Sequence, residues 1–294
     1  MFWNGLEQQI GAATGQRFSA GQRHTLSGGC INQAWRIGSG DREYFMKAHA
    51  AAGLSMFAAE AAGLAELAAS HTVRVPKPVC WGSVAGQAYL VLEYLPLGGS
   101  DTARTMETLG RQLALLHRQP QPYFGWQRDN TIGSTPQPNE RHADWIAFWS
   151  KQRLGFQLQR AADNGHGGVL QRQGEALLAR FAGLFASYAP TPSLLHGDLW
   201  AGNAGCTIGG EPVIFDPAVY YGDREADLAM TELFGGFPAR FYAAYRETWP
   251  LDAGYPQRRT LYNLYHILNH LNLFGGGYRS QAERMMGQLL AELG

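Results

Sequence analysis

The sequence predicts an α+β fold of two lobes, with a small β-rich lobe in residues 1–95 and a large, mainly helical lobe in residues 96–294. Three observations support it. Short apolar runs separated by turn residues fill the first third of the chain, and apolar residues at helical spacing fill most of the remainder. Residues 95–99, which contain proline and glycine, separate the two regions, so a hinge is expected there.

The small lobe is predicted as a sheet with one internal helix. Its expected strands are residues 35–37, 44–48, 79–84 and 88–94, joined in pairs by turns at 38–41 and 85–87. Between the two pairs, the alanine-rich residues 50–69 carry Phe57, Leu64 and Leu67 at helical spacing, so this stretch is a helix and not a linker. A further helix is expected at the N-terminus, over residues 5–14.

The large lobe is predicted to be mostly helical. One short strand pair is expected around residues 205–215. The expected helices cover residues 102–118, 139–162, 173–188, 224–234, 238–249, 256–274 and a last segment from residue 280.

Composition excludes several classes of protein. Lys plus Arg equals Asp plus Glu, at 24 each, so no net field attracts nucleic acid or an anionic membrane. No apolar run approaches the roughly 20 residues that span a bilayer, and the N-terminus lacks the pattern of a signal peptide. Three scattered cysteines form neither a disulfide framework nor a zinc site. A soluble, cytoplasmic monomer or homodimer is expected.

The most informative motif is His-Gly-Asp-Leu-Trp-Ala-Gly-Asn at residues 196–203, followed by Asp216 after a short apolar strand. Kinase catalytic loops place an Asp and an Asn five residues apart, with a metal-binding Asp downstream. The spacing therefore predicts Asp198 as the catalytic base and Asn203 and Asp216 as ligands of Mg²⁺. The His-Gly-Asp form favours kinases of small molecules, in a two-lobed protein-kinase-like fold. The alternative is a surface turn rich in Gly, Asn and Asp.

The small lobe carries residues suited to ATP. Lys47 ends an otherwise apolar strand, where an ammonium can contact the α- and β-phosphates if a carboxylate from the next helix holds it. Glu60 is the expected partner, with Glu66 as the rival. Gly28 and Gly29 lie where a phosphate-covering loop would be, although an ordinary glycine hairpin is the alternative.

Other predicted contacts concern adenine and the acceptor. Glu93, Tyr94 and Leu95 close an apolar strand before the hinge, and their backbone groups are expected to bind the adenine edge. His196 is expected to brace the catalytic loop by hydrogen bonds. Trp200 either packs in the core or forms an aromatic platform for a substrate ring.

These motifs resemble the fructosamine kinase family, also called ketosamine 3-kinases. Residues 196–203 resemble its catalytic loop, and residues 216–227 resemble its metal segment, with Asp-Pro-Ala in place of Asp-Phe-Gly. Residues 131–139 resemble its substrate-lobe insertion, and residues 262–270 resemble its C-terminal helices. One departure is Asp223, where many members carry His, which leaves the role of that position open.

The resemblance implies an ATP- and Mg²⁺-dependent kinase that phosphorylates the sugar 3-hydroxyl of a ketosamine, free or protein-bound, and so promotes deglycation. The substrate residues that it implies are Trp200, Asp144, Trp145, Arg153 and His270. Which ketosamine is preferred stays open.

Two alternatives and one minor expectation remain. An aminoglycoside or choline phosphotransferase would share the lobes and the loop, and Asp129, Glu140 and Asp144 could make its cleft acidic. A non-catalytic nucleotide-binding scaffold is disfavoured because the base, the metal ligands and the lysine are all present. Cys30, between the predicted strands, is either a small apolar filler or a thiol sensitive to oxidation.

Overall fold

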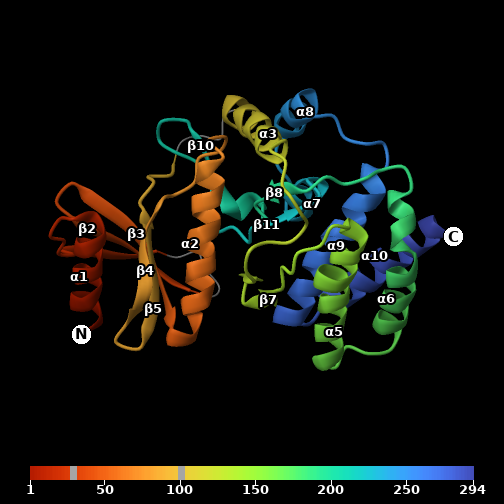
Figure 1. Ribbon diagram of the computed structural model, residues 1–294, viewed down its shortest axis with the longest axis horizontal. Coiled ribbons are helices and arrows are strands. Elements are labelled where there is room, and N and C mark those ends of the chain that lie inside the picture. Colours follow the sequence, from red (N-terminus) through yellow and green to blue (C-terminus); the bar gives the residue numbers. More distant parts are fainter. Residues whose placement is uncertain (27–31, 99–102) are drawn as a thin grey trace. The chain divides into compact units, whose positions relative to one another are not determined.

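The computed structural model describes residues 1–26, 32–98 and 103–294 (Figure 1). Gly28, Gly29 and Cys30, predicted to lie in the phosphate-covering loop, fall outside the described residues. The chain forms two compact units, Met1–Thr105 with Ala204–Pro217 and Met106–Asn203 with Ala218–Gly294. Residues 96–98, 103–105 and 204–217 thus pack in the first unit, whereas the sequence prediction places them in the second lobe.

The first unit is built on a five-stranded antiparallel sheet in the order β1-β2-β3-β5-β4. Its strands are β1 (Gln22–Leu26), β2 (Gln33–Ser39), β3 (Arg42–Ala50), β4 (Pro78–Val84) and β5 (Gln87–Glu93). Helices α1 (Phe2–Thr14) and α2 (Leu54–Ala69) lie on opposite sides of the sheet (Figure 1). Leu6 and Ile10 of α1 pack against Met46 and Val91 in a buried core. Central β3 is thereby fixed in place, and with it Lys47.

Helix α2 contradicts the prediction about apolar runs made from the sequence. The window Ala51–Ala69 is, by length and composition alone, long and apolar enough to cross a membrane, so the statement that no apolar run approaches that length is wrong. The described residues hold no other such helix. Phe57, Leu64 and Leu67 of α2 are fully buried, as in a core helix of a globular lobe. Its apolar character therefore has an explanation in packing.

A hairpin of β9 (Ala204–Cys206) and β10 (Pro212–Ile214) belongs to the first unit although it comes late in the chain. Gly98 donates its backbone N–H to Cys206, at 3.1 Å, and Ile208 donates to Pro96, also at 3.1 Å. Backbone hydrogen bonds between segments more than 100 residues apart thus tie the hairpin to the residues predicted as the hinge.

The second unit is mainly helical. Its regular helices are α3 (Ala103–His117, which begins in the first unit), α4 (Trp145–Phe148), α5 (Gly155–Asp163), α6 (Val169–Arg180), α7 (Glu225–Leu233), α8 (Ala239–Thr248), α9 (Tyr255–Phe274) and α10 (Tyr278–Leu293). Helix α9 is buried along most of its length, between α5, α7 and α10. Two strand pairs complete the unit, β6 (Asn130–Ile132) with β7 (Thr135–Gln137), and β8 (Ser193–Leu195) with β11 (Tyr220–Gly222).

The helix predicted at 139–162 is wrong at its start. The chain is extended through β7, and α4 begins only after Asp144, whose carboxylate accepts the N–H of Ala147 at 2.7 Å as an N-cap. A π-helical turn, Trp149–Leu154, then joins α4 to α5. The strand pairs β6–β7 and β8–β11 were not predicted, because strands of three residues are too short to show alternation.

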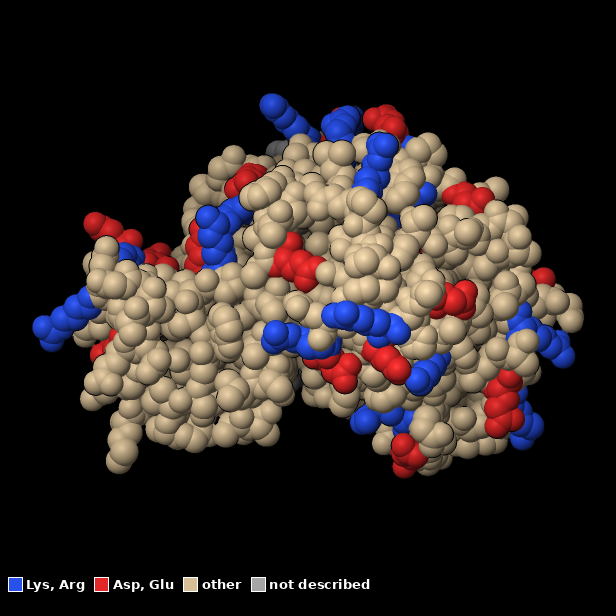
Figure 2. All heavy atoms as spheres, in the orientation of Figure 1, with Lys and Arg blue, Asp and Glu red and all other residues tan. Residues whose placement is uncertain are grey.

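Charged side chains are mixed on the molecular surface. On the face drawn in Figure 2, Lys and Arg lie among Asp and Glu, as the balanced composition leads one to expect. Several form local pairs, such as Arg279 with Glu283 on one face of α10.

Candidate active site

The His-Gly-Asp loop leaves the end of β8, which pairs with β11. Gly197 has a φ of +82°, and a Cβ atom there would lie 2.1 Å from the backbone oxygen of Ala218. Ala218 in turn donates its N–H to the carbonyl of His196, at 2.9 Å. This close approach of two backbones explains the glycine of the motif.

The carboxylate of Asp227, in α7, binds the backbone of the His-Gly-Asp loop. Its carboxylate accepts the N–H of His196 at 2.7 Å and of Gly197 at 2.8 Å, and its Oδ2 lies 3.2 Å from Nε2 of His117. Nδ1 of His117 lies 2.9 Å from the Tyr245 hydroxyl. Burial raises the pKa of Asp227, but the hydrogen bonds and charges from His117, His196 and Gly197 outweigh it and hold that pKa below its ordinary value.

Sequence reasoning missed Asp227 and His117 as site residues. The only local signal is an acidic residue in the first turn of a helix, which the helix dipole already explains. The His-Gly-Asp loop is thus held by a buried carboxylate that its own motif does not contain.

We expect Asp227→Asn to lower the free energy of unfolding by about 3 kcal/mol at pH 7, because a buried charged acceptor loses its ionised form. The pKa of Asp227 is depressed in the folded state, so its contribution is full above an unfolded pKa of about 3.9 and declines as the pH falls through the folded value. Urea unfolding from pH 7 to pH 3 measures this.

Glu283→Gln is the matched control, because it removes a surface i,i+4 pair with Arg279 and should change stability by less than about 0.5 kcal/mol. A difference between wild type and Asp227→Asn that stayed constant down to pH 3 would contradict the role given to the charge of Asp227.

Asp198 and Asn203 are locked together within the loop. Nδ2 of Asn203 donates to the backbone oxygen of Asp198 at 2.9 Å and to its Oδ2 at 3.2 Å. The N–H of Asp198 donates to Nδ1 of the fully buried His196 at 3.2 Å. Because the nitrogen of the Asn203 amide is committed to Asp198, the atom of this side chain suited to a cation is the oxygen.

The first unit holds the other predicted residues. Lys47 is only 6% exposed, and its Nζ lies 2.8 Å from Oε1 of Glu60 and 2.6 Å from Oδ1 of Asp216. The carboxylate that α2 supplies to Lys47 is thus that of Glu60 and not of Glu66. Burial lowers the pKa of Lys47, but the charges of Asp216 and Glu60 outweigh it and raise that pKa above its ordinary value. Burial raises the pKa of Glu60, against the opposing effect of Lys47.

Asp216 follows the β9–β10 hairpin and has a φ of +56°, in the left-handed region where Asp and Asn are tolerated better than most residues. Its side chain is 45% exposed. Ala204 pairs with Ile214 across the hairpin, so Asn203 and Phe215 both flank its open end. Along the chain, Asn203 directly precedes the hairpin and Asp216 follows its last paired residue by two positions.

The donor set fits Mg²⁺. One carboxylate and one amide oxygen are hard ligands, and Mg²⁺ is commonly bound by one or two such groups together with phosphate oxygens and water. In residues 1–26, 32–98 and 103–294, no three His, Cys, Asp or Glu residues cluster as a metal site. This donor set therefore suits a cation that also binds phosphate oxygens and water, and not one held by protein side chains alone.

The segment predicted to bind adenine ends β5. The carboxylate of Glu93 pairs with Arg74 and accepts the N–H of Lys77 at 3.2 Å. The Tyr94 ring lies under the guanidinium of Arg36, with Leu95 half-buried beside it in the chain. The side chains of Glu93 and Tyr94 are thus engaged within the first unit, and the N–H of Glu93 donates to the carbonyl of Lys77 at 2.8 Å.

The predicted substrate residues divide into two groups. Trp200 is 38% exposed and packs edge-on against Phe234, which packs against His270 at 4.8 Å between ring centroids. Trp200 therefore lies at the surface, in an aromatic group, and not in the core. Asp144, also exposed, serves as the N-cap of α4.

Trp145 and Arg153 are buried instead. Trp145 is 2% exposed and donates to the Tyr262 hydroxyl, at 3.2 Å. Arg153 is fully buried, donates to the carbonyl of Pro138 at 2.6 Å, and stacks on Tyr220. Packing occupies both side chains in this structure, and their role as substrate contacts stays a prediction.

Asp223, where the sequence departs from the resembled pattern, is fully buried. It accepts the Tyr188 hydroxyl at 2.9 Å, the Tyr262 hydroxyl, and the N–H of Glu225 at 3.0 Å at the start of α7. Burial raises its pKa against the effect of these hydrogen bonds. Asp223 thus organises the start of the helix that carries Asp227.

The fold is that of the kinase-like phosphotransferases. An aminoglycoside phosphotransferase solved in ternary complex with ADP and hygromycin B superposes with a TM-score of 0.67 over 97% of this chain and 98% of that chain, at 13% identity. At that identity the likeness shows the fold alone.

The family follows from closer relatives. The model of the family described as fructosamine kinase matches residues 2–292. A probable ketoamine kinase of Synechocystis sp. is 49% identical over 98% of this chain and 97% of its own, and the chloroplastic protein-ribulosamine 3-kinase of Arabidopsis thaliana is 43% identical over 92% and 82%. A crystal structure from Haemophilus somnus 129PT, assigned as a fructosamine-3-kinase, has a TM-score of 0.90 at 30% identity and covers 98% of both chains. The chain belongs to the fructosamine kinase family.

Proposed function

We propose that this protein transfers the γ-phosphoryl group of ATP to the 3-hydroxyl of a ketosamine, a sugar whose ketose C1 is linked to an amine. The carrying observation is the catalytic loop, in which Asp198 is fixed by Asn203, His196 and the buried Asp227. The relatives named as ketoamine and ribulosamine kinases supply the substrate class.

Asp198 is proposed as the base. Asp198 is half-buried, and its backbone is held by hydrogen bonds to His196 and from Asn203, so the group is both accessible and fixed. It would accept a hydrogen bond from the acceptor hydroxyl, orient it in line with the γ-phosphorus, and take its proton as the bond to phosphorus forms. The β-phosphate oxygen of ADP leaves with the bonding electrons.

Lys47 is proposed to hold the α- and β-phosphates of ATP. Its ammonium is buried and stays charged, because Glu60 and Asp216 raise its pKa. Glu60, itself nearly buried, fixes the direction of the Lys47 side chain. The main chain at Glu93, Tyr94 and Leu95 is proposed to bind adenine, and Gly28 and Gly29 to cover the phosphates.

Asn203 and Asp216 are proposed as the protein ligands of Mg²⁺. A cation held there would supply neutralisation of the charge that develops on the phosphate oxygens. Asp216 would then exchange part of its interaction with Lys47 for the cation, which its 45% exposure permits.

The sugar side of the site is proposed to include Trp200 and His270. Trp200 presents an exposed indole two residues after the base, and an aromatic face suits the apolar face of a sugar ring. Phe234 supports both rings. Asp144 is proposed as a weaker substrate contact, because its carboxylate already caps α4.

A coupled ADP-release assay tests the substrate class. We expect turnover with ribulosamines, erythrulosamines or fructosamines, offered both as free adducts of lysine and on a glycated protein, and no turnover with aminoglycosides or choline. Turnover with an aminoglycoside but with none of the ketosamines would contradict the proposal.

The cytoplasm is the proposed location, in keeping with bacterial relatives such as that of Synechocystis.

A further inference from the structure

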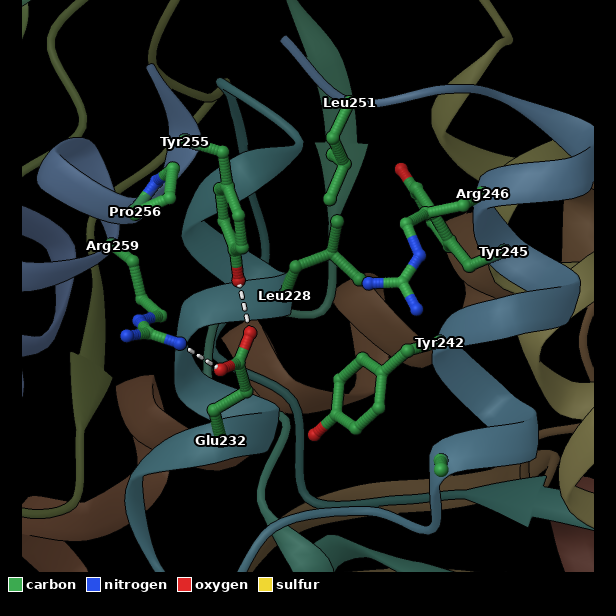
Figure 3. A pocket seen from close by; sticks show the side chains of 10 residues that line it. Leu228, Glu232, Tyr242, Tyr245, Arg246, Leu251, Tyr255, Pro256 and Arg259 are labelled. Atoms are coloured by element: carbon green, nitrogen blue, oxygen red, sulfur yellow. Dashed lines mark hydrogen bonds and ion pairs between the residues drawn. The ribbon is translucent and has the colours of Figure 1, made fainter. Parts of the chain in front are cut away.

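A pocket of about 310 Å³ lies in the second unit, between α7, α8 and the start of α9 (Figure 3). This volume is at the lower end of the range for sites that bind small molecules. Leu228, Leu251 and Pro256 supply apolar surface, and Tyr242 and Tyr245 supply ring faces and hydroxyl groups. None of these residues belongs to the proposed catalytic or sugar-binding groups.

The charge in the pocket is positive. Arg246 extends over it from α8, on the side of Tyr242 and Tyr245 in Figure 3, and makes no hydrogen bond or ion pair within the described residues. Arg259 lines the pocket as well and pairs with Glu232, which also accepts the Tyr255 hydroxyl at 2.6 Å. Two guanidinium groups against one carboxylate leave an excess positive charge that favours an anion.

The pocket wall is connected to the catalytic loop by hydrogen bonds. The hydroxyl of Tyr245 lies 2.9 Å from Nδ1 of His117, whose Nε2 lies 3.2 Å from the carboxylate of Asp227. That carboxylate accepts the N–H groups of His196 and Gly197, directly before the proposed base. A ligand against Tyr245 would thus be three hydrogen bonds from the loop backbone.

A second connection reaches the aromatic group at the sugar side. The Tyr242 hydroxyl accepts the N–H of Phe237 at 3.0 Å and donates to the carbonyl of Thr231 at 3.2 Å. These bonds fix the end of α7 to the turn that follows it, and Phe234 in that turn packs against Trp200. Both tyrosine walls of the pocket therefore contact elements that position the proposed site.

We propose that this pocket is an effector site for a small organic anion, whose carboxylate or phosphate is held by Arg246 and whose ring or aliphatic body lies against Leu228 and Leu251. Occupancy changes turnover through Tyr245 and His117. The inference goes beyond the proposed function, because anion binding can be measured without substrate.

Ligand-observed NMR with benzoate, phenyl phosphate and neutral benzamide tests the binding. We expect one or both anions to bind, with benzamide weaker by at least about tenfold, because a charge-assisted hydrogen bond contributes more than a neutral one. Arg246→Gln should weaken the anion by a similar factor, and Arg240→Gln, on the same helix but outside the pocket, should not. Equal affinity in wild type and Arg246→Gln, displacement by Mg-ATP or ketosamine, or no binding of either anion would overturn the proposal.

Kinetics test the connection. With ATP and ketosamine saturating, the bound anion should change kcat of the wild type. Tyr245→Phe, which lacks the hydroxyl that contacts His117, should bind the anion within about threefold of wild type yet show a reduced effect on kcat. An anion that binds the wild type through Arg246 without any change in kcat, or whose effect is the same in Tyr245→Phe, would overturn the link to the catalytic loop.

Discussion

Asp198→Asn should retain the affinity for ATP and lose at least about 10²-fold in kcat. The proposed base contacts the acceptor hydroxyl and not the nucleotide, and general-base assistance contributes about 10²–10⁴-fold. The asparagine matches the aspartate in size, and the backbone oxygen at position 198 still accepts from Asn203, so the loop should keep its conformation. Calorimetry with ATP and the ADP-release assay measure the two quantities.

Asp163→Asn makes the matched control, because it is an exposed substitution of the same kind at the end of α5. Its kcat should equal that of the wild type. If Asp198→Asn retained near-normal turnover, Asp198 would not be the base. A loss of ATP affinity equal to the loss of kcat would instead indicate a disrupted site.

Asp216→Asn should abolish activity at millimolar Mg²⁺, with kcat at least about 10²-fold lower, because the charged ligand of the cation is gone. Asparagine is the chosen substitution since it tolerates the left-handed backbone at this position, where φ is +56°, better than alanine does. Lys47 keeps its ion pair with Glu60, so the thermal melt should stay close to that of the wild type.

Asn203→Ala is the companion variant. It removes a neutral ligand, so its defect should be milder than that of Asp216→Asn and partly rescued by added Mg²⁺. A titration of both variants with Mg²⁺ separates them. Wild-type turnover of Asp216→Asn, with an unchanged dependence on Mg²⁺ concentration, would show that Asp216 is not a metal ligand.

Sequence predicted the parts of the fold that local pattern specifies. Alternation identified β3, a continuous apolar run identified β5, and the spacing of Phe57, Leu64 and Leu67 identified α2. Strand β1 is exposed along four of its five residues and carries little apolar signal. The attachment of residues 204–217 to the first unit depends on backbone hydrogen bonds from Gly98 and Ile208, and no local pattern encodes these.

The site residues likewise fall into two groups, those that local motifs predict and those that only the structure reveals. A spacing of five residues and a lysine in an apolar strand pointed to Asp198, Asn203 and Lys47, because these motifs are local. The hydrogen bonds that hold the His-Gly-Asp loop join residues far apart in the sequence. His117 is separated from Asp227 by 110 positions and from Tyr245 by 128. Such partners are chosen by packing and only the structure reveals them. The burial of Arg153 against Tyr220 is likewise a tertiary fact that its position in the sequence did not reveal.

The position of the transferred phosphate tests the central claim most directly. Wild-type protein, ATP, Mg²⁺ and a free ribulosamine or fructosamine would be incubated, and the product examined at once by phosphorus–proton correlation NMR. The proposed function predicts a phosphomonoester coupled to the proton on carbon 3 of the sugar, absent from the parallel reaction with Asp198→Asn. Phosphate on another hydroxyl, or an unmodified ketosamine in the presence of turnover with some other alcohol, would contradict it.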